Sequence, residues 1–199
     1  MGEAIVITSG KGGVGKTTTT ANVGTSLALL GKKVCLIDTD IGLRNLDVAM
    51  GLENRIIYDL VDVIEGRCKI NQALVKDKRF DGLLYLLPAA QTSDKTAVKP
   101  KQMKALVNEL KQDYDYVIID CPAGIEQGYR NAVAGADKAI VVTTPEKTAV
   151  RDADRIIGLL EKEEGVEPPK LVINRIRSHM VHNGDMLDID EITSHLSID

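Results

Sequence analysis

A glycine-rich loop constrains the fold of this 199-residue chain more than any other stretch. Residues 10–17 read G-K-G-G-V-G-K-T, with an apolar run at 4–7 before them and a helix-like segment after them. This order matches the G-x-x-x-x-G-K-[ST] pattern, in which backbone N–H groups at a helix N-terminus surround phosphate oxygens. Glycine permits the close approach, the lysine brings charge to the β- and γ-phosphates, and the threonine hydroxyl suits Mg²⁺. The residues predicted to bind nucleotide here are Gly10, Lys11, Gly12, Gly13, Val14, Gly15, Lys16, Thr17 and Thr18.

The same letters allow a second interpretation as a dinucleotide-binding loop. Gly10, Gly12 and Gly15 fit G-x-G-x-x-G, and Asp38 ends the next apolar run at about the distance of the ribose-binding acid of that fold. The pair Lys16 and Thr17 favours the phosphate loop, because a dinucleotide fold requires neither residue.

Apolar runs recur along the chain and alternate with helix-like stretches. This alternation predicts an α/β fold with a doubly wound, mostly parallel sheet flanked by helices, as in P-loop NTPases of the deviant Walker A type. With no Trp and one Phe, the core must consist of aliphatic side chains, which suits a sheet buried on both faces. Strands are predicted at 4–8, 33–37, 83–87, 116–119, 139–143 and 171–173. Helices are predicted at 16–30, 56–64, 70–75, 100–112, 148–164 and 188–196, and a mobile loop at 41–50.

Carboxylates end two of the predicted strands. The second strand runs into Asp38-Thr39-Asp40 and the fourth into Asp120, and strand ends of such folds face the ligand crevice. Thr17, Asp38 and Asp120 are predicted to hold Mg²⁺, directly or through water, while Asp40 orients the attacking water. Gly124 follows in a turn that can contact the γ-phosphate.

The end of the sixth predicted strand carries polar residues as well. Asn174 and Arg175 follow that strand, and the amide of Asn174 can contact the adenine edge. These residues complete the predicted nucleotide site at its base end.

Composition narrows the possible classes of partner. A net charge of −4 gives no overall attraction to nucleic acid, and none is expected as a partner. Three widely spaced cysteines without a C-x-x-C pair suggest neither a zinc site nor a disulfide framework, and reduced thiols are expected. No signal peptide and no apolar run long enough to span a bilayer is evident.

Four stretches together resemble the division-site-selection branch of the ParA/MinD family of deviant Walker A ATPases. They are G-K-G-G-V-G-K-T at 10–17, I-D-T-D-I-G-L-R-N-L-D at 37–47, I-I-D-C-P-A-G at 118–124 and N-R-I-R at 174–177. The resemblance implies Mg²⁺-dependent ATP hydrolysis and an ATP-dependent homodimer with two nucleotides at its interface. It assigns catalytic roles to Lys11, Lys16 and Asp40, with Lys11 reaching the nucleotide of the partner.

The family also implies partners and a location. The expected partners are the division inhibitor MinC, a topological factor that is either MinE or DivIVA-linked, and the membrane surface. The protein is expected in the cytoplasm and reversibly on the inner face of the plasma membrane. Members of the family continue past the position where this sequence stops, with further strands and an amphipathic membrane-binding helix. The expectation is therefore one P-loop ATPase domain over residues 1–199, without that C-terminal part.

Other functions remain open at this point. A ParA-like DNA- or plasmid-partitioning ATPase and a flagellar-number regulator share the same motifs. An electron-transfer or metal-cluster protein on this scaffold would need cysteines placed to share a cluster, and only Cys121 adjoins a site motif. A nucleotide-binding module without hydrolysis is hard to reconcile with the presence of Lys16, Asp40 and Asp120.

Overall fold

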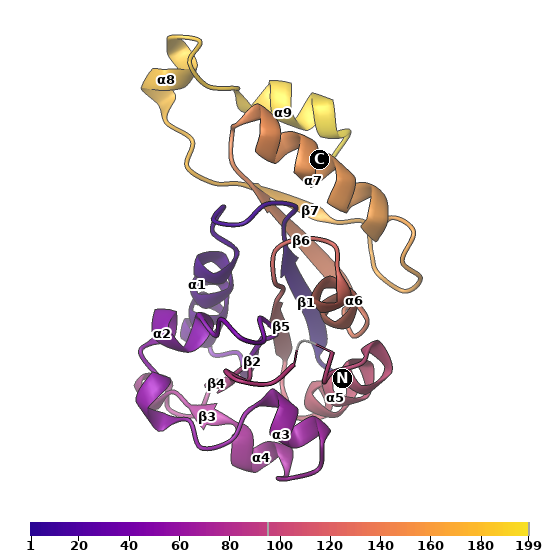
Figure 1. Ribbon diagram of the computed structural model, residues 1–199. Helices are drawn as coiled ribbons and strands as arrows, with labels where there is room; N and C mark the ends of the chain where they lie inside the picture. Colours follow the sequence, from indigo (N-terminus) through magenta and orange to yellow (C-terminus); the bar gives the residue numbers. More distant parts are fainter. Residues whose placement is uncertain (95, 199) are drawn as a thin grey trace.

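The structure is a computed structural model that describes residues 1–94 and 96–198. Within those residues, seven strands form one sheet in the order β3-β4-β2-β5-β1-β6-β7 (Figure 1). The short β3 runs antiparallel to β4, and the other pairings are parallel. The predicted doubly wound, mostly parallel α/β fold is confirmed. The strands are β1 Glu3–Thr8, β2 Val34–Asp38, β3 Val75–Lys76, β4 Leu84–Leu87, β5 Tyr116–Asp120, β6 Lys138–Thr143 and β7 Lys170–Ile173.

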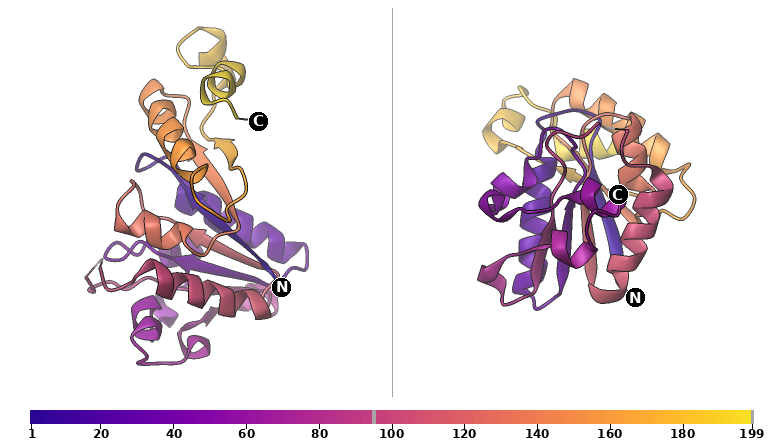
Figure 2. Two further views of the ribbon diagram at one scale, coloured as in Figure 1. Left: turned by 90° about the vertical axis from the view of Figure 1, so that its right-hand side faces the viewer. Right: turned by 60° about the horizontal axis from the view of Figure 1, so that its bottom comes forward.

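Helices cover both faces of the sheet (Figure 2). One face carries α1 and α2, and the other carries α5, α6 and α7, with α9 packed on α7. The helices are α1 Lys16–Leu29, α2 Leu46–Met50, α3 Leu60–Ile64, α4 Ile70–Ala73, α5 Pro100–Asp113, α6 Gln127–Val133, α7 Lys147–Leu160, α8 Ser178–His182 and α9 Ile189–Leu196. Single 3₁₀ turns lie at Glu53–Arg55 and Lys78–Phe80.

The core consists of two aliphatic clusters separated by the sheet. Alternate residues of β2 point to opposite faces, so Cys35 and Ile37 join the cluster under α5 to α7, while Leu36 joins the one under α1. All five residues of β2 are buried, as expected for a central parallel strand. The carboxyl ends of β1, β2 and β5 therefore emerge side by side from a rigid layer.

The prediction of a mobile loop over 41–50 is wrong in its second half. Leu46–Met50 forms the helix α2, in which Leu46 and Met50 are buried. Gly51 ends it with φ +67°, a conformation that glycine adopts without steric cost. The helix was missed because five residues are too few to show helical periodicity, and tertiary contacts hold it in place.

Candidate active site

The predicted phosphate loop connects the end of β1 to the start of α1. Gly13 has φ +77° and Gly15 has φ +109°, both in the region that favours glycine. A Cβ on Gly13 would meet nothing within 4 Å, whereas a Cβ on Gly15 would lie 2.4 Å from Asn174 Nδ2. A Cβ on Gly12 would lie 3.8 Å from Ala123, in the turn that contains Gly124. The loop is thus open at Gly13 and bordered by the turns that follow β5 and β7.

Lys16 begins α1 and is nearly buried, with 8% of its surface exposed. Its ammonium donates to Ser9 Oγ at 3.0 Å, and no carboxylate oxygen in the described part of the chain lies within 4 Å of it. A buried cation with only a hydroxyl partner is costly unless an anion accompanies it. The open loop and this unpaired charge together fit a phosphate group.

Asp120 ends β5 beside the first turn of α1. Its Oδ1 accepts a hydrogen bond from Thr20 Oγ1 at 3.2 Å, and the Thr17 hydroxyl bonds to the same carboxyl group. Burial raises the pKa of Asp120 to about 6, although the two hydroxyls and the Lys16 charge oppose that rise. A threonine hydroxyl and a carboxylate that meet at the phosphate loop are the donor set that Mg²⁺ uses with nucleotide phosphates.

Asp38 lies beside Asp120 in the pairing of β2 with β5. Its carboxylate also accepts hydrogen bonds from the segment that follows β2. Its Oδ1 accepts the N–H of Asp40 at 2.9 Å, and its Oδ2 accepts the N–H of Leu46 at 3.1 Å. Burial, together with the charges of Asp120 and Asp40, raises the pKa of Asp38 to about 7. The structure gives Asp38 this loop-holding role, while its contribution to a metal ion stays a prediction.

Asp40 lies at the entrance of that segment and is partly exposed. Its carbonyl accepts the N–H groups of Leu43 and Arg44 at 3.2 and 3.1 Å, which closes a turn. Thr39 Oγ1 donates to the carbonyl of Asp120 at 2.6 Å, so the turn is also tied to the end of β5. Asp40 thus stands at the predicted place, and its role in orienting water stays a prediction.

Lys11, near the start of the phosphate loop, contacts the beginning of helix α7, whereas Lys16 contacts Ser9. The Lys11 ammonium lies 3.2 Å from Glu146 Oε2 and donates to Thr148 Oγ1 at 3.2 Å. Both members of the ion pair are exposed, with 40% of the Lys11 side chain and 60% of the Glu146 side chain accessible. Sequence reasoning missed both partners, because 135 residues separate Glu146 from Lys11 and no pattern joins them.

Asn174 connects the end of β7 to the phosphate loop. Its Nδ2 donates to the carbonyl of Val14 at 2.9 Å, and its Oδ1 accepts the N–H of Arg175 at 2.9 Å. The structure therefore brings Asn174 and Arg175 to the predicted site, while contact with adenine stays a prediction.

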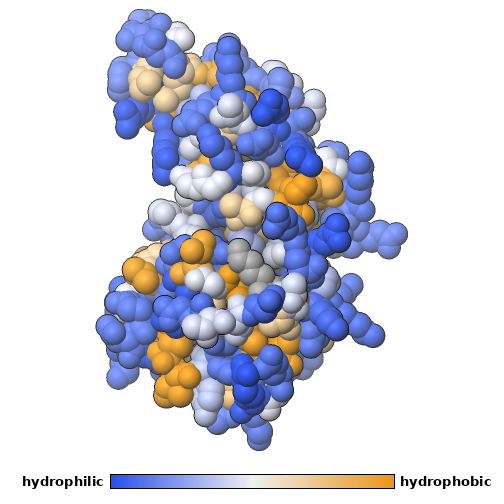
Figure 3. All heavy atoms as spheres, in the orientation of Figure 1, coloured by the Kyte–Doolittle hydropathy of each residue, from blue (hydrophilic) through white to orange (hydrophobic). Residues whose placement is uncertain are grey.

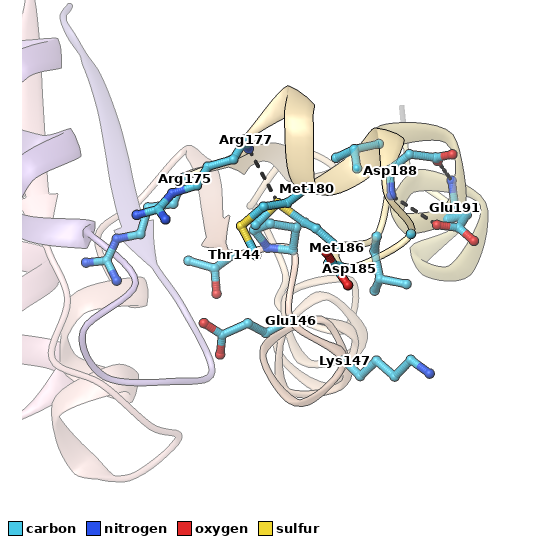
Figure 4. A pocket seen from close by; sticks show the side chains of 14 residues that line it. Thr144, Glu146, Lys147, Arg175, Arg177, Met180, Asp185, Met186, Asp188 and Glu191 are labelled. Carbon is cyan, nitrogen blue, oxygen red and sulfur yellow. Dashed lines mark hydrogen bonds between the residues drawn. The ribbon is translucent and has the colours of Figure 1, made fainter.

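A cleft of about 870 Å³ extends from Arg175 between the turn after β6 and helix α8. Arg175 and Glu146 line it on the side of the phosphate loop, and Met180 and Met186 line it nearer to α8 (Figure 4). The two methionines carry no motif, so the sequence did not indicate that they line a cleft.

A cluster of three or more His, Cys, Asp or Glu side chains able to hold a metal ion is absent from the described residues.

Among the helices of the described residues, none combines the length and apolar character needed to cross a membrane. The face seen in Figure 1 is mostly hydrophilic, and its hydrophobic residues gather in several separate patches (Figure 3).

Known proteins resemble this chain along most or all of its length. The AAA_31 family, described as an AAA domain, matches residues 2–171. The septum site-determining protein MinD of Bacillus subtilis (strain 168) is 81% identical over 199 residues, which are 100% of this chain and 74% of that protein. MinD of Synechocystis is 58% identical over 198 residues, with 100% of this chain and 74% of that protein covered.

Solved structures of relatives share the fold. A MinC:MinD cell division protein complex from Aquifex aeolicus matches with a TM-score of 0.88 and 53% identity, covering 99% of this chain and 78% of that one. MinD of Pyrococcus horikoshii complexed with Mg-ADP matches with a TM-score of 0.87 and 29% identity, covering 100% of this chain and 79% of that one. The phosphate loop, the aspartates at the ends of β2 and β5 and these relatives agree, and the chain belongs to the MinD family of septum site-determining proteins.

Proposed function

We propose that this chain is a Mg²⁺-dependent ATPase switch that dimerises with ATP and positions a division inhibitor at the membrane. One observation carries the proposal: Lys16 is nearly buried on the open loop near Asp120, Thr17 and Asp40, and no described carboxylate oxygen lies within 4 Å of its ammonium. The relative from Pyrococcus horikoshii that was solved with Mg-ADP supports a nucleotide at this position.

Each residue of the site has a distinct part in this mechanism. Lys16 and the backbone N–H groups of the loop bind the phosphates and offset the charge that develops on transfer. Thr17 and Asp120 would hold Mg²⁺, which neutralises phosphate charge when bound. Asp40 orients the water for attack, and Asp38 holds the backbone of Asp40 through its N–H group. Asn174 braces the loop at Val14, and its amide would contact the edge of the adenine base.

The position of Lys11 supports an ATP-dependent dimer. Its pair with Glu146 is exposed and therefore weak, so Lys11 can leave it and reach a nucleotide held by a second copy. In this proposal Lys11 stabilises the transferring phosphoryl group in trans. The ATP-bound dimer then binds MinC, as the Aquifex aeolicus complex suggests, and hydrolysis resets the switch. The topological partner is either MinE or a DivIVA-linked factor. The protein cycles between the cytoplasm and the inner face of the plasma membrane.

Phosphate release and oligomeric state test this proposal together. The parent chain should release phosphate from ATP only with Mg²⁺. Asp40→Ala should lower kcat by about 100-fold and accumulate as a dimer in ATP, as expected when the residue that orients water is removed. Lys11→Ala should stay monomeric in ATP, whereas Lys32→Ala, which removes an exposed lysine outside the site, should behave as the parent.

Two results would overturn the proposal. An Asp40→Ala protein that hydrolyses ATP at the parent rate would remove the assigned role of Asp40. Retention of the ATP-bound protein on duplex DNA, with a steep dependence on salt, would instead favour a partitioning ATPase.

A further inference from the structure

We propose that the ion pair between Arg44 and Asp47 holds the segment that carries Asp40 in its working position. Arg44 and Asp47 are then positioning residues for hydrolysis. The inference rests on the proposed ATPase function and on the role of Asp40 in it.

The segment between β2 and α2 is fixed at both of its ends. Near its start, Thr39 Oγ1 donates to the carbonyl of Asp120 at 2.6 Å, and the N–H of Asp40 donates to Asp38. At its end, the N–H of Leu46 donates to Asp38 Oδ2 at 3.1 Å. One carboxylate thus accepts hydrogen bonds from both ends of the segment, and the position of Asp40 depends on where Leu46 lies.

Arg44 occupies the middle of this segment in a strained conformation. Its φ is +48°, which a residue with a Cβ adopts only when its surroundings compensate. Its N–H donates to the carbonyl of Asp40 at 3.1 Å, so its backbone is joined directly to the turn at Asp40. Any change in the backbone of Arg44 is therefore transmitted to Asp40.

The compensation comes from Asp47. Arg44 Nε lies 2.7 Å from Asp47 Oδ2, and the Asp47 side chain is fully buried while 17% of the Arg44 side chain is exposed. No described residue, Arg44 included, donates an aligned hydrogen bond to either oxygen of Asp47, so the attraction between Arg44 and Asp47 is that of two close charges. A buried carboxylate without other partners holds its cation firmly, because separating them would leave an isolated charge in the protein interior.

The helix that carries Asp47 is itself anchored at its far end. Arg79 donates to the carbonyl of Met50, the last residue of α2, at 2.6 Å, and the same guanidinium pairs with the buried Asp77. The helix also packs against α1, which begins at Lys16. The position of Asp47 is therefore fixed by the helix that carries it. Because Asp47 pairs with Arg44, the pair also fixes the turn at Asp40.

Three variants separate positioning from simple stabilisation. Arg44→Gln removes the cation and leaves Asp47 charged, Asp47→Asn removes the anion, and the double variant removes both charges. Arg67→Gln is the matched control, because Arg67 follows α3, is about half exposed and pairs with Asp62 at 2.7 Å, outside the segment between β2 and α2. For each variant we would measure kcat and KM for ATP, the melting temperature, and the hydrogen exchange rate of the Leu46 amide.

Positioning predicts a specific pattern across these measurements. Arg44→Gln should lower kcat by about tenfold or more with KM within about twofold, since misplacement of a catalytic group affects the chemical step. The Leu46 amide should exchange faster, and Arg44→Lys should recover part of kcat. The double variant should regain most of the melting temperature, because no unpaired charge remains buried, but its kcat should stay low. The control should match the parent.

Other outcomes would contradict the inference or its premise. Recovery of kcat together with stability in the double variant would show that the pair serves stability alone. An unchanged Leu46 exchange rate in Arg44→Gln would show that the pair does not hold the segment. If the parent itself failed to hydrolyse ATP, the proposed function would fail, whereas a parent that hydrolyses ATP at the same rate as Arg44→Gln would overturn only this inference.

Discussion

Lys11 and Lys16 belong to one loop but lie in different surroundings. Lys16 is nearly buried and donates to a serine hydroxyl, while Lys11 is well exposed and pairs with a glutamate. An exposed pair contributes less than about 1 kcal/mol, whereas a buried cation without an anion lowers stability. The chain therefore carries at Lys16 a charge whose favourable partner is a ligand.

Replacement of Lys16 by methionine should show this difference. Without nucleotide, Lys16→Met should raise the unfolding free energy by about 1 kcal/mol, because an unpaired buried charge is replaced by an apolar chain of similar length. The thermal stabilisation that ATP gives the parent should disappear. Lys11→Met should change the unfolding free energy by less than about 1 kcal/mol. Urea unfolding with and without ATP measures both, and a marked loss of stability in Lys16→Met would show that the ammonium is already compensated.

The buried carboxyl group of Asp120 should make stability depend on pH. Its folded pKa of about 6 lies above the ordinary value of 3.8, so folding favours the protonated form. Its contribution to the unfolding free energy is therefore full below pH 4 and is lost as the pH rises through about 6. A shift of this size corresponds to about 3 kcal/mol.

Asp120→Asn tests that dependence in the absence of Mg²⁺ and nucleotide. The parent should lose more stability than this variant between about pH 4 and about pH 7, because asparagine does not ionise. Asp154→Asn, which alters an exposed residue of α7, should follow the parent. Parallel curves for the parent and Asp120→Asn would contradict the assignment.

At the scale of elements, the close contact of α1 with the sheet depends on a stripe of residues four apart. Lys16, Thr20, Gly24 and Ala28 are the buried positions of this helix. A Cβ on Gly24 would lie 2.4 Å from Leu36 Cδ2, and Leu36 is fully buried on β2. Small residues here bring the helix close enough for Thr20 to reach Asp120.

Gly24→Ala should accordingly destabilise the protein, although alanine favours helices. Overpacking against Leu36 should cost about 1–3 kcal/mol, more than the gain of up to about 1 kcal/mol in helix propensity. Gly158→Ala is the matched control in α7, where an added Cβ meets nothing within 4 Å, and it should stabilise by about 0.5–1 kcal/mol. Chemical denaturation of both variants decides the matter, and equal stabilisation by the two would refute the packing argument.

How much the sequence could predict depended on element length. The central strands were predicted to within a residue at each end, because strands buried on both faces appear as continuous apolar runs. Helices α2, α6 and α8 were missed or taken as loop, since five to seven residues show no clear period. The helix predicted over 70–75 was too long, because it ends at Ala73 and Val75 begins strand β3. These short elements are specified by distant contacts, such as the hydrogen bond from Leu46 to Asp38.

The positions of the candidate site residues could be predicted from the sequence, but the contacts that hold them could not. Lys16, Thr17, Asp38 and Asp120 could be located because each lies at a strand end or in a local motif. The contacts of Lys11 with Glu146 and of Arg44 with Asp47 could not be predicted, because they depend on how loops pack and on side-chain direction. The sequence therefore predicts which residues act, and the structure adds the contacts that hold them in place.

At the scale of the whole molecule, one end of the sheet carries the candidate site and the opposite end carries an ion pair that joins three elements. The carboxyl ends of β1, β2 and β5 carry the candidate site, as is general for open parallel sheets. At the opposite end, Lys111 of α5 contacts both oxygens of Asp137 at 2.7 and 2.6 Å. The same carboxylate accepts the N–H of Ala4 at the start of β1 at 2.8 Å. Asp137 thus joins α5, β1 and the start of β6.

Asp137→Ala should weaken the fold without altering the site. The Lys111 side chain is 9% exposed, so loss of its anion would leave a nearly buried charge and should lower the unfolding free energy by about 3 kcal/mol.

Lys138→Met is the control, because Lys138 pairs with Glu3 at 2.7 Å with both side chains about a third exposed, and it should cost less than about 1 kcal/mol. ATP affinity should stay within about twofold of the parent in both variants at temperatures where they are folded, since Ala4 and Lys111, the described partners of the Asp137 side chain, lie outside the site. Urea unfolding and nucleotide titration measure the two quantities independently. A large loss of ATP affinity in folded Asp137→Ala protein would show that the two ends of the sheet are coupled, because a carboxylate at one end would then influence phosphate binding at the other.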